Sequence, residues 1–392
     1  MKIAIVNTET PGGAYVASQR VCHALQKQGV EVSFVSIKAT KWNFLWERFC
    51  IWVNNRFSRK NLFAVSIANT GTDISQLPAI QQADIIHLHW INQGGLSLRN
   101  IEQLQALGKP IVWTMHDMWP FTGICHHAHG CTNYSDNCGN CHLLKCPSES
   151  DLSSCVLAKK RVGFSSIHFV AVSTWLQHKA EQSPFVKSVV TIPNVLDTSV
   201  FTIQDKKEAR RYYQLPVDKK IILMGAGKLN DPIKGFIYLR EALSKLDNPN
   251  LYCLCVFGGI KKAPHFLDNM PIQTIWLHRS FTSTELAKLY VAADVTVVPS
   301  LYETFGQTLS ESLSCGTPVV SFNNSGQTDI IIHKQNGYLA QWKNAEDLSK
   351  GILYVLSHSF DTEELRKSAV SRYSESVVAQ QYRQLYQSLL SK

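Results

Sequence analysis

The chain has 392 residues, 45% of them hydrophobic and 18% charged, and its formal net charge at pH 7 is +9. This length exceeds what one ordinary hydrophobic core accommodates, so we expect two domains. The composition excludes a low-complexity or disordered protein, and no apolar run reaches the roughly 20 residues that span a bilayer. The positive charge favours an anionic partner, and nucleotide phosphates, anionic lipid and nucleic acid would all qualify.

Short apolar runs alternate with helical patterns in the first half of the chain, as they do in βαβ units of a parallel sheet. The first run is too short for a signal peptide and is typical of a buried strand, so we expect a cytoplasmic protein. We predict strands at 2–7, 31–37, 84–90, 110–115, 168–173 and 189–194.

Residues 41–60 form an aromatic and basic helical pattern between the second and third predicted strands. Apolar residues recur there at helical spacing, namely Trp42, Leu45, Trp46, Phe49, Cys50, Val53 and Phe57. Most amphipathic helices pack their apolar face on a core, and we favour that alternative slightly. The tryptophans and the accompanying Lys and Arg residues favour a helix in the lipid interface, at the inner face of the cell membrane.

Five of the eleven cysteines fall within residues 114–147. In a reducing cytoplasm, clustered cysteines bind metal more often than they form disulfides. Cys138-x2-Cys141 has the spacing of a zinc half-site, and Cys125-x5-Cys131 would supply the other half. Further candidate ligands in the same segment are Cys146, His126, His127, His129 and His142. Four thiolates would close the tetrahedron and make such a zinc site structural. The alternative is a loop of reduced, partly buried thiols.

The second half repeats the alternation of strands and helices. Its predicted strands are 220–227, 251–259, 274–278, 295–300 and 318–322. Its predicted helices are 234–246, 283–292, 304–315 and a long final pattern from about 345 to 390.

These patterns predict an α/β fold of two Rossmann-like, doubly wound domains that face each other across a cleft. We place the N-terminal domain at 1–205, with a cysteine-rich insertion at 125–155. The C-terminal domain would be 206–375. Residues 376–392 would form a helix that packs back toward the N-terminal domain.

Glycines and lysines follow the first strand of each half. Gly12 and Gly13 would let the backbone approach a ligand at a helix N-terminus, which favours anions. A tight turn explains this pair equally well. Lys228 and Lys234 lie in a loop where two cations would suit a diphosphate, and the alternative is a solvated basic loop.

The segment 300–320 carries the most specific signal. We place Glu303 at the end of a strand and Glu311 about two turns along a helix, which separates them by about 12 Å. That separation excludes a carboxylate pair sharing one proton and favours two contacts to a long polyhydroxylated ligand. The helix N-terminus between them would offer N–H groups to phosphate. Those groups belong to Phe305, Gly306, Gln307 and Thr308.

This segment, "ETFGQTLSE" followed by "CGTPVV", resembles the E-x7-E motif of the family-4 retaining glycosyltransferases (glycosyl transferases group 1), which have the GT-B fold. "GAGKLNDPIKG" (225–235) is similar to the family's "GRL…KG", with Lys228 in place of the usual Arg. Pro11, Gly12 and Gly13 resemble its N-terminal glycine loop. "HDMWPFTGIC" (116–125) and the cysteines after it resemble a cysteine-rich subset of the family. The resemblance covers nearly the whole chain.

The resemblance implies that the domain at 1–205 lies on the acceptor side and that the domain at 206–375 binds the nucleotide sugar. It also implies a role for each matching residue. Glu303 would bind hydroxyls of the donor sugar and Glu311 those of the ribose. Lys228 and Lys234 would neutralise the leaving diphosphate. His116 would lie near the reacting carbon. Backbone groups that would contact donor phosphate or sugar belong to Gly13, Phe305 and Gly306.

The implied activity is transfer of a sugar, with retention, from a UDP or GDP sugar to a glycan or lipid-linked glycan acceptor in surface polysaccharide or glycoconjugate synthesis. No Asp-x-Asp occurs in the sequence, so we expect no catalytic metal. A nucleotide-sugar epimerase or a phosphorylase on the same fold is the alternative. A zinc-containing nucleic-acid-binding protein would explain the charge and the cysteines, but not the E-x7-E motif, so we expect no nucleic-acid partner.

Overall fold

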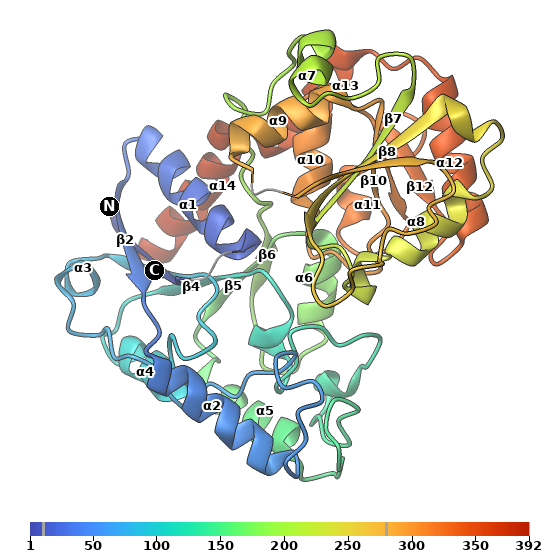
Figure 1. The fold of residues 1–392 in the computed structure, drawn as a ribbon. Coiled ribbons are helices and arrows are strands. Elements are labelled where there is room, and N and C mark those ends of the chain that lie inside the picture. Colours follow the sequence, from blue (N-terminus) through green and yellow to red (C-terminus); the bar gives the residue numbers. More distant parts are fainter. Residues whose placement is uncertain (10–11, 279–280, 392) are drawn as a thin grey trace. The chain divides into compact units, whose positions relative to one another are not determined.

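The computed structural model describes residues 1–9, 12–278 and 281–391. The chain divides into two compact units, the first made of residues 1–193 and 378–392 and the second of residues 194–377. Within the described residues, each unit contains a six-stranded parallel sheet with helices (Figure 1). Two such sheets confirm the predicted α/β fold with two Rossmann-like domains.

The sheet of the first unit contains all the strands predicted for the first half, several of them shorter than expected. They are β1 (Lys2–Thr8), β2 (Glu31–Ile37), β3 (Ile85–Leu88), β4 (Ile111–Met115), β5 (His168–Ala171) and β6 (Val189–Thr191). Their order across the sheet is β2-β1-β3-β4-β5-β6. Strands β3 and β4 are buried along their whole length, which explains why they are continuous apolar runs without alternation.

Helices and short 3-10 turns connect these strands. The helices are α1 (Gly13–Lys27), α2 (Lys41–Asn54), α3 (Pro78–Gln81), α4 (Leu98–Gln105), α5 (Leu152–Gly163) and α6 (Thr174–Glu181). The 3-10 turns are η1 (Trp119–Phe121) and η2 (Asn133–Ser135).

Helix α14 (Glu375–Leu390) returns to the first unit from Val378 on. Its Tyr386 hydroxyl lies 2.7 Å from Nδ1 of His87 on β3, and its Tyr382 hydroxyl lies 2.9 Å from Oγ1 of Thr114 on β4. Nε2 of His87 and Oγ1 of Thr114 are 2.7 Å apart, so the two contacts form one buried network. This polar network attaches the end of the chain to the centre of the first sheet.

The sheet of the second unit has the order β12-β11-β10-β7-β8-β9. Its strands are β7 (Lys220–Lys228), β8 (Tyr252–Gly259), β9 (Gln273–Leu277), β10 (Val295–Val298), β11 (Val319–Phe322) and β12 (Gly337–Ala340). Its helices are α7 (Lys206–Tyr212), α8 (Phe236–Leu243), α9 (Ser283–Ala292), α10 (Gln307–Ser314), α11 (Gln327–Ile330), α12 (Ala345–Ser357) and α13 (Thr362–Tyr373). Its 3-10 turns are η3 (Pro232–Lys234) and η4 (Pro249–Leu251).

The boundary between the units lies earlier than the boundary at 205 that the sequence suggested. The backbone N–H of Leu196 donates to the Tyr373 carbonyl at 2.8 Å. Arg366 on α13 donates to the carbonyls of Phe201, at 2.7 Å, and Thr198, at 2.9 Å. These bonds attach residues 196–201 to α13, which belongs to the second unit.

The C-terminal pattern from 345 to 390, which was predicted to be helical, consists of three helices, and the last of them begins at Glu375, close to the helix predicted at 376–392. Helix α12 ends where His358 takes an extended conformation. The Asp361 carboxylate then accepts from the N–H groups of Glu363 and Glu364 and starts α13 as an N-cap. Strand β12 was not predicted, because it begins with a glycine and its two central residues are only partly buried, so it is not a continuous apolar run.

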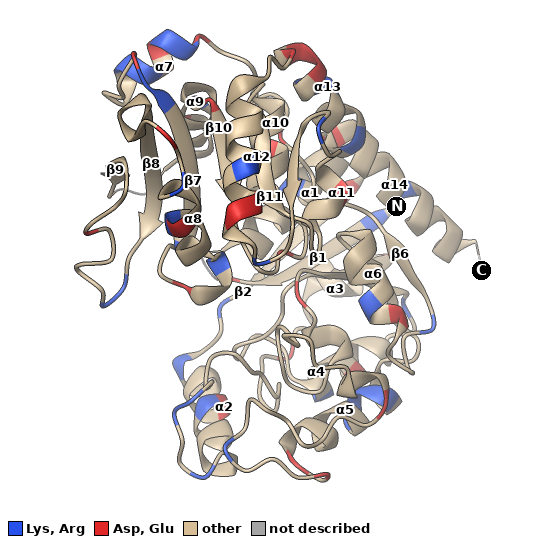
Figure 2. Ribbon diagram, turned by 90° about the vertical axis from the view of Figure 1, so that its right-hand side faces the viewer, with Lys and Arg blue, Asp and Glu red and all other residues tan. Residues whose placement is uncertain are grey.

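The Lys and Arg residues behind the net positive charge are spread over elements of both units, including α5, α7 and α13 (Figure 2). The net positive charge therefore does not come from a single element.

The network under α14 predicts a stability effect. Tyr386→Phe removes the hydroxyl that pairs with the fully buried His87, so the free energy of unfolding should fall by about 1–3 kcal/mol. Urea unfolding followed by circular dichroism would measure it. Tyr212→Phe, at a side chain that is 49% exposed, is the matched control. Equal stability of Tyr386→Phe and the native chain would contradict this role.

Candidate functional site

The candidate site in the second unit surrounds the carboxyl ends of β7 and β10. Strand β7 lies between β10 and β8, so the connections on its two sides run in opposite directions. Ligands of doubly wound sheets bind at such a switch point. Lys228 ends β7 and is exposed, Lys234 follows in η3, and Glu303 follows β10.

Lys234 and Glu303 form an ion pair, with 2.7 Å between Nζ and Oε1. The side chains are 31% and 21% exposed, so both remain accessible to a ligand. The Glu303 carboxylate raises the pKa of Lys234, which therefore keeps its charge. The E-x7-E motif predicted Glu303 and the string "GAGKLNDPIKG" predicted Lys234, and the structure brings the two side chains together.

The chain before Lys234 is attached to the end of β10. The Asp231 carboxylate accepts from the Ile233 N–H at 3.1 Å and shapes the turn. The Leu301 N–H then donates to the Ile233 carbonyl at 2.7 Å. This pair of bonds fixes the position from which Lys234 reaches Glu303.

Gly235 makes that approach possible. Its φ is +67°, and a Cβ at this position would lie 1.8 Å from the Pro299 carbonyl oxygen. No side chain fits there, so the turn can meet the strand only with glycine. Sequence reasoning identified the loop but not this requirement.

Glu303 is also held through its backbone. Its N–H donates to the Ser325 hydroxyl at 3.0 Å, and its carbonyl accepts from the Gly326 N–H at 2.8 Å. A Cβ on Gly326 would lie 2.4 Å from the Thr304 carbonyl oxygen, so this packing also depends on a glycine. The loop before α11 therefore sets the position of the Glu303 carboxylate.

Glu311 lies one turn into α10 rather than two, because that helix begins only at Gln307. The predicted 12 Å of helical rise was wrong for the same reason, since the residues from Glu303 to Gly306 are not helical. Glu311 is 5% exposed, and its Oε2 accepts from the Tyr290 hydroxyl at 3.0 Å. Burial and the Glu311 charge raise the pKa of Tyr290, which therefore remains a donor. Sequence reasoning missed Tyr290, which lies on another helix.

The other residues predicted around α10 have different surroundings. Gly306 is the residue before the helix, with φ +104°, a conformation that suits glycine. The Phe305 side chain is buried against Tyr373, with 5.3 Å between ring centroids, so only its backbone can face a ligand. Gln307 and Thr308 open the helix and are partly exposed.

Gly12 and Gly13 open α1 in the first unit, directly after β1. A Cβ on either residue would meet no atom within 4 Å, so the space beside this helix N-terminus is open. The φ of Gly12 is 173°, an extended conformation that any residue adopts. Pro11 of the predicted glycine loop lies outside the described residues.

His116 follows β4 in the first unit. Its Nε2 lies 2.9 Å from Nδ1 of His89, which follows β3. Burial lowers the pKa of His116 to about 4, although the neighbouring Asp117 opposes that shift. Burial also lowers the pKa of His87 to about 3. These imidazoles are therefore neutral near pH 7 and serve as hydrogen-bonding groups rather than acids.

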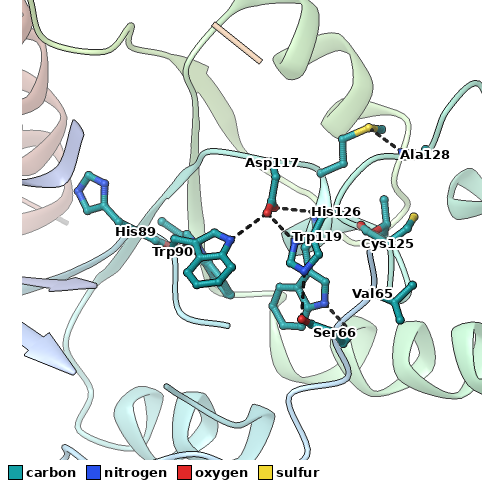
Figure 3. A network of polar contacts seen from close by, with 12 residues as sticks. Val65, Ser66, His89, Trp90, Asp117, Trp119, Cys125, His126 and Ala128 are labelled. Atoms are coloured by element: carbon teal, nitrogen blue, oxygen red, sulfur yellow. Dashed lines mark hydrogen bonds and ion pairs between the residues drawn. The ribbon is translucent and has the colours of Figure 1, made fainter. Parts of the chain in front are cut away.

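Asp117, the next residue, joins the strand to the cysteine-rich segment (Figure 3). Its Oδ2 accepts from Nε1 of Trp90 at 3.0 Å and lies 2.6 Å from Nδ1 of His126. Nε2 of His126 lies 3.0 Å from the Ser66 hydroxyl. Sequence reasoning missed both His89 and Asp117, although "HLHW" and "HD" end neighbouring strands.

The four predicted zinc ligands, Cys125, Cys131, Cys138 and Cys141, are free thiols. Burial raises the pKa of Cys125 to about 12 and that of Cys138 to about 11, and the neighbouring thiols add to both shifts. Across the described parts of the chain, no three Cys, His, Asp or Glu side chains are arranged to hold a metal ion. The donor chemistry suits zinc, but the four thiols would have to converge, so the zinc site stays a prediction.

Two family models match the chain. Glycosyltransferase Family 4 matches residues 11–200, and Glycosyl transferases group 1 matches residues 205–372. The two matches lie one after the other and together span most of the sequence.

Several glycosyltransferases match part of the chain, and two of them show how far the match extends. The chain is 34% identical over 181 residues to the D-inositol 3-phosphate glycosyltransferase of Stackebrandtia nassauensis. The matched region covers 41% of this chain and 40% of that protein. It is 28% identical over 188 residues to the N,N'-diacetylbacillosaminyl-diphospho-undecaprenol alpha-1,3-N-acetylgalactosaminyltransferase of Campylobacter jejuni. That matched region covers 47% of this chain and 49% of the relative. The chain thus spans less than half the length of these relatives.

Solved structures match over the whole chain. Sucrose-phosphate synthase from Thermosynechococcus elongatus has a TM-score of 0.67 at 18% identity and covers 100% of this chain and 99% of its own. HepE of Anabaena, in complex with UDP-glucose, has a TM-score of 0.64 at 15% identity and covers 99% of this chain and 100% of its own. At such identities the likeness concerns the fold alone, and it confirms the predicted GT-B fold. With both family models matched, the chain belongs to the glycosyltransferases of family 4 and group 1.

Proposed function

We propose that this protein is a retaining glycosyltransferase that moves a sugar from a nucleotide diphosphate sugar, of the UDP or GDP type, to a glycan or lipid-linked glycan acceptor. The Lys234–Glu303 pair at the carboxyl ends of β7 and β10 carries the proposal. It provides a cation for a diphosphate beside a carboxylate for sugar hydroxyls.

The names of similar proteins support this substrate class. HepE was solved with UDP-glucose, and the Campylobacter relative is named for an acceptor linked to undecaprenol through a diphosphate. A nucleotide-sugar donor and a glycan acceptor on a lipid carrier would suit this chain in the same way.

In the proposed reaction, the bond between the anomeric carbon and the diphosphate oxygen breaks, and a bond to an acceptor hydroxyl oxygen forms on the same face of the sugar. The diphosphate leaves with the bonding electrons, and one of its oxygens takes the proton of the acceptor hydroxyl. Lys234 and Lys228 would offset the developing negative charge, so no catalytic metal is needed. The N–H groups at the start of α10 would bind the phosphates.

In the proposed reaction, Glu303, Glu311 and His116 would each bind a different part of the substrates. Glu303 would accept hydrogen bonds from donor-sugar hydroxyls, while its ion pair keeps Lys234 in place. Glu311, positioned by Tyr290, would accept from the ribose hydroxyls. Neutral His116 would hydrogen-bond near the reacting carbon, a role that rests on the resemblance.

Donor binding and stereochemistry test the function directly. UDP or GDP should raise the melting temperature of the protein, while an oligonucleotide should not. A panel of UDP and GDP sugars should then give transfer in which proton NMR of the first-formed product shows the donor's anomeric configuration. Stabilisation by the oligonucleotide alone, or an epimerised donor as the only product, would contradict the proposal.

Variants of the ion pair test the site. Lys234→Ala and Glu303→Ala should each lower kcat/KM by a factor of about 100 or more, the usual effect of losing one group that stabilises developing charge. The matched control is the exposed Lys350–Glu346 pair, whose N–O distance is 2.8 Å. Lys350→Ala and Glu346→Ala should leave kcat/KM unchanged. Full activity of either Lys234→Ala or Glu303→Ala would refute the donor-site assignment.

We also propose a structural zinc ion held by Cys125, Cys131, Cys138 and Cys141. Metal analysis of purified protein should find about one zinc per chain, and Cys138→Ser combined with Cys141→Ser should remove it and lower the melting temperature. Cys155→Ser, at an exposed thiol outside the proposed ligand set, should keep the zinc. A native protein that is folded without metal would disprove the zinc site.

A further inference from the structure

Helix α2 buries charged side chains and exposes aromatic ones. Glu47 and Arg48 are 0% and 5% exposed, whereas Trp42 and Trp46 are 81% and 54% exposed. Of its apolar residues, Ile51 is fully buried. The favoured alternative, a helix whose aromatic face packs on the core, is therefore wrong.

Polar anchors set this orientation. Oε1 of Glu47 accepts from the N–H groups of Ile67, at 2.8 Å, and Ala68, at 2.9 Å. Arg48 pairs with Oε2 of Glu47 at 2.8 Å and donates to the Val65 carbonyl at 2.9 Å. Rotating the helix would break all of these bonds and leave the N–H groups of Ile67 and Ala68 without their acceptor.

The exposed side chains form what we call the α2 aromatic patch. It consists of Trp42, Leu45, Trp46, Phe49, Val53, Phe57 and Phe63, each at least 40% exposed. The centre of the patch is contiguous, because the rings of Trp46 and Phe49 lie 5.7 Å apart and those of Phe49 and the partly buried Trp52 lie 6.1 Å apart. Trp52 in turn lies 4.8 Å from Phe57. Contiguous exposed apolar surface of this kind marks an interaction site.

The charge around the patch has one sign. Between residues 38 and 63, Glu47 is the only acidic residue in the sequence, and it is buried. The exposed charged side chains of this stretch are Lys38, Lys41, Arg56, Arg59 and Lys60. Figure 2 shows Lys and Arg along α2 and the loop after it. Aromatic rings inside a basic border complement the headgroup region of an anionic bilayer.

The geometry fits a helix that lies on a bilayer rather than one that crosses it. Helix α2 has 14 residues. Its length of about 21 Å is shorter than the roughly 30 Å of a hydrocarbon core. Among the described helices, none is long and apolar enough to span a membrane.

We propose that the α2 aromatic patch docks the protein on a bilayer that contains anionic phospholipid, with the rings at the headgroup boundary and the basic residues on the lipid phosphates. This inference goes beyond the proposed reaction and does not depend on it. It requires only the exposed rings, the basic border and the buried anchors.

Vesicle co-sedimentation with the full chain tests the proposal. Native protein should pellet with vesicles of phosphatidylglycerol and phosphatidylcholine, more weakly in high salt, and much less with phosphatidylcholine alone. The combined change Trp42→Ser, Trp46→Ser and Phe49→Ser should lower partitioning by at least about tenfold. Changing Arg56, Arg59 and Lys60 together to Gln should lower it about a hundredfold.

Matched controls separate this patch from general stickiness. Val162→Ser and Ile237→Ser change apolar residues that are 83% and 71% exposed outside the patch, and both should partition like the native chain. Circular dichroism should show that all variants are folded. Native protein that stays in the supernatant overturns the proposal. A dimer in sedimentation velocity that the serine variant abolishes, with no vesicle binding, would show that the patch pairs two copies and would also overturn it.

Discussion

The candidate donor site depends on one ion pair, between Lys234 and Glu303, that joins the ends of two parallel strands. Both partners come from loops, where side chains ordinarily have freedom, so the surrounding backbone has to hold them. Gly235 allows one loop to reach β10, and Gly326 allows another to reach the residues beside Glu303. Two positions without side chains thus fix the distance between a cation and a carboxylate, which is the kind of preorganisation that a charged substrate requires.

Much of the fold could be predicted from the sequence because parallel strands buried on both faces are continuous apolar runs. Strands β10 and β11 of the second half were predicted for that reason, whereas β12 was missed because it begins with a glycine and is only partly buried at its centre. The pattern from 345 to 390 was predicted to be helical because it contains few glycines and no proline, and the break between α12 and α13 was not predicted. The chain leaves the helical conformation at His358, and the Asp361 carboxylate starts α13 as an N-cap, which is a local signal that periodicity does not show.

The candidate site was predictable in its members but not in its contacts. Glu303 and Glu311 belong to the E-x7-E motif and Lys234 to the string "GAGKLNDPIKG", so all three were recognisable in the sequence. Tyr290 lies on a different helix, and only the fold places its hydroxyl against Glu311. Likewise, periodicity showed that α2 has an apolar face, but its orientation depends on bonds from Glu47 to Ile67 and Ala68, far along the chain.

The buried anchors of α2 have a consequence for how the sequence can vary. Because Glu47 and Arg48 supply the attachment, the outward rings contribute little to the stability of the first unit. Substitutions at those outward positions therefore leave the fold intact. The surface chemistry of α2 can then change under selection without the cost in stability that limits change in a core.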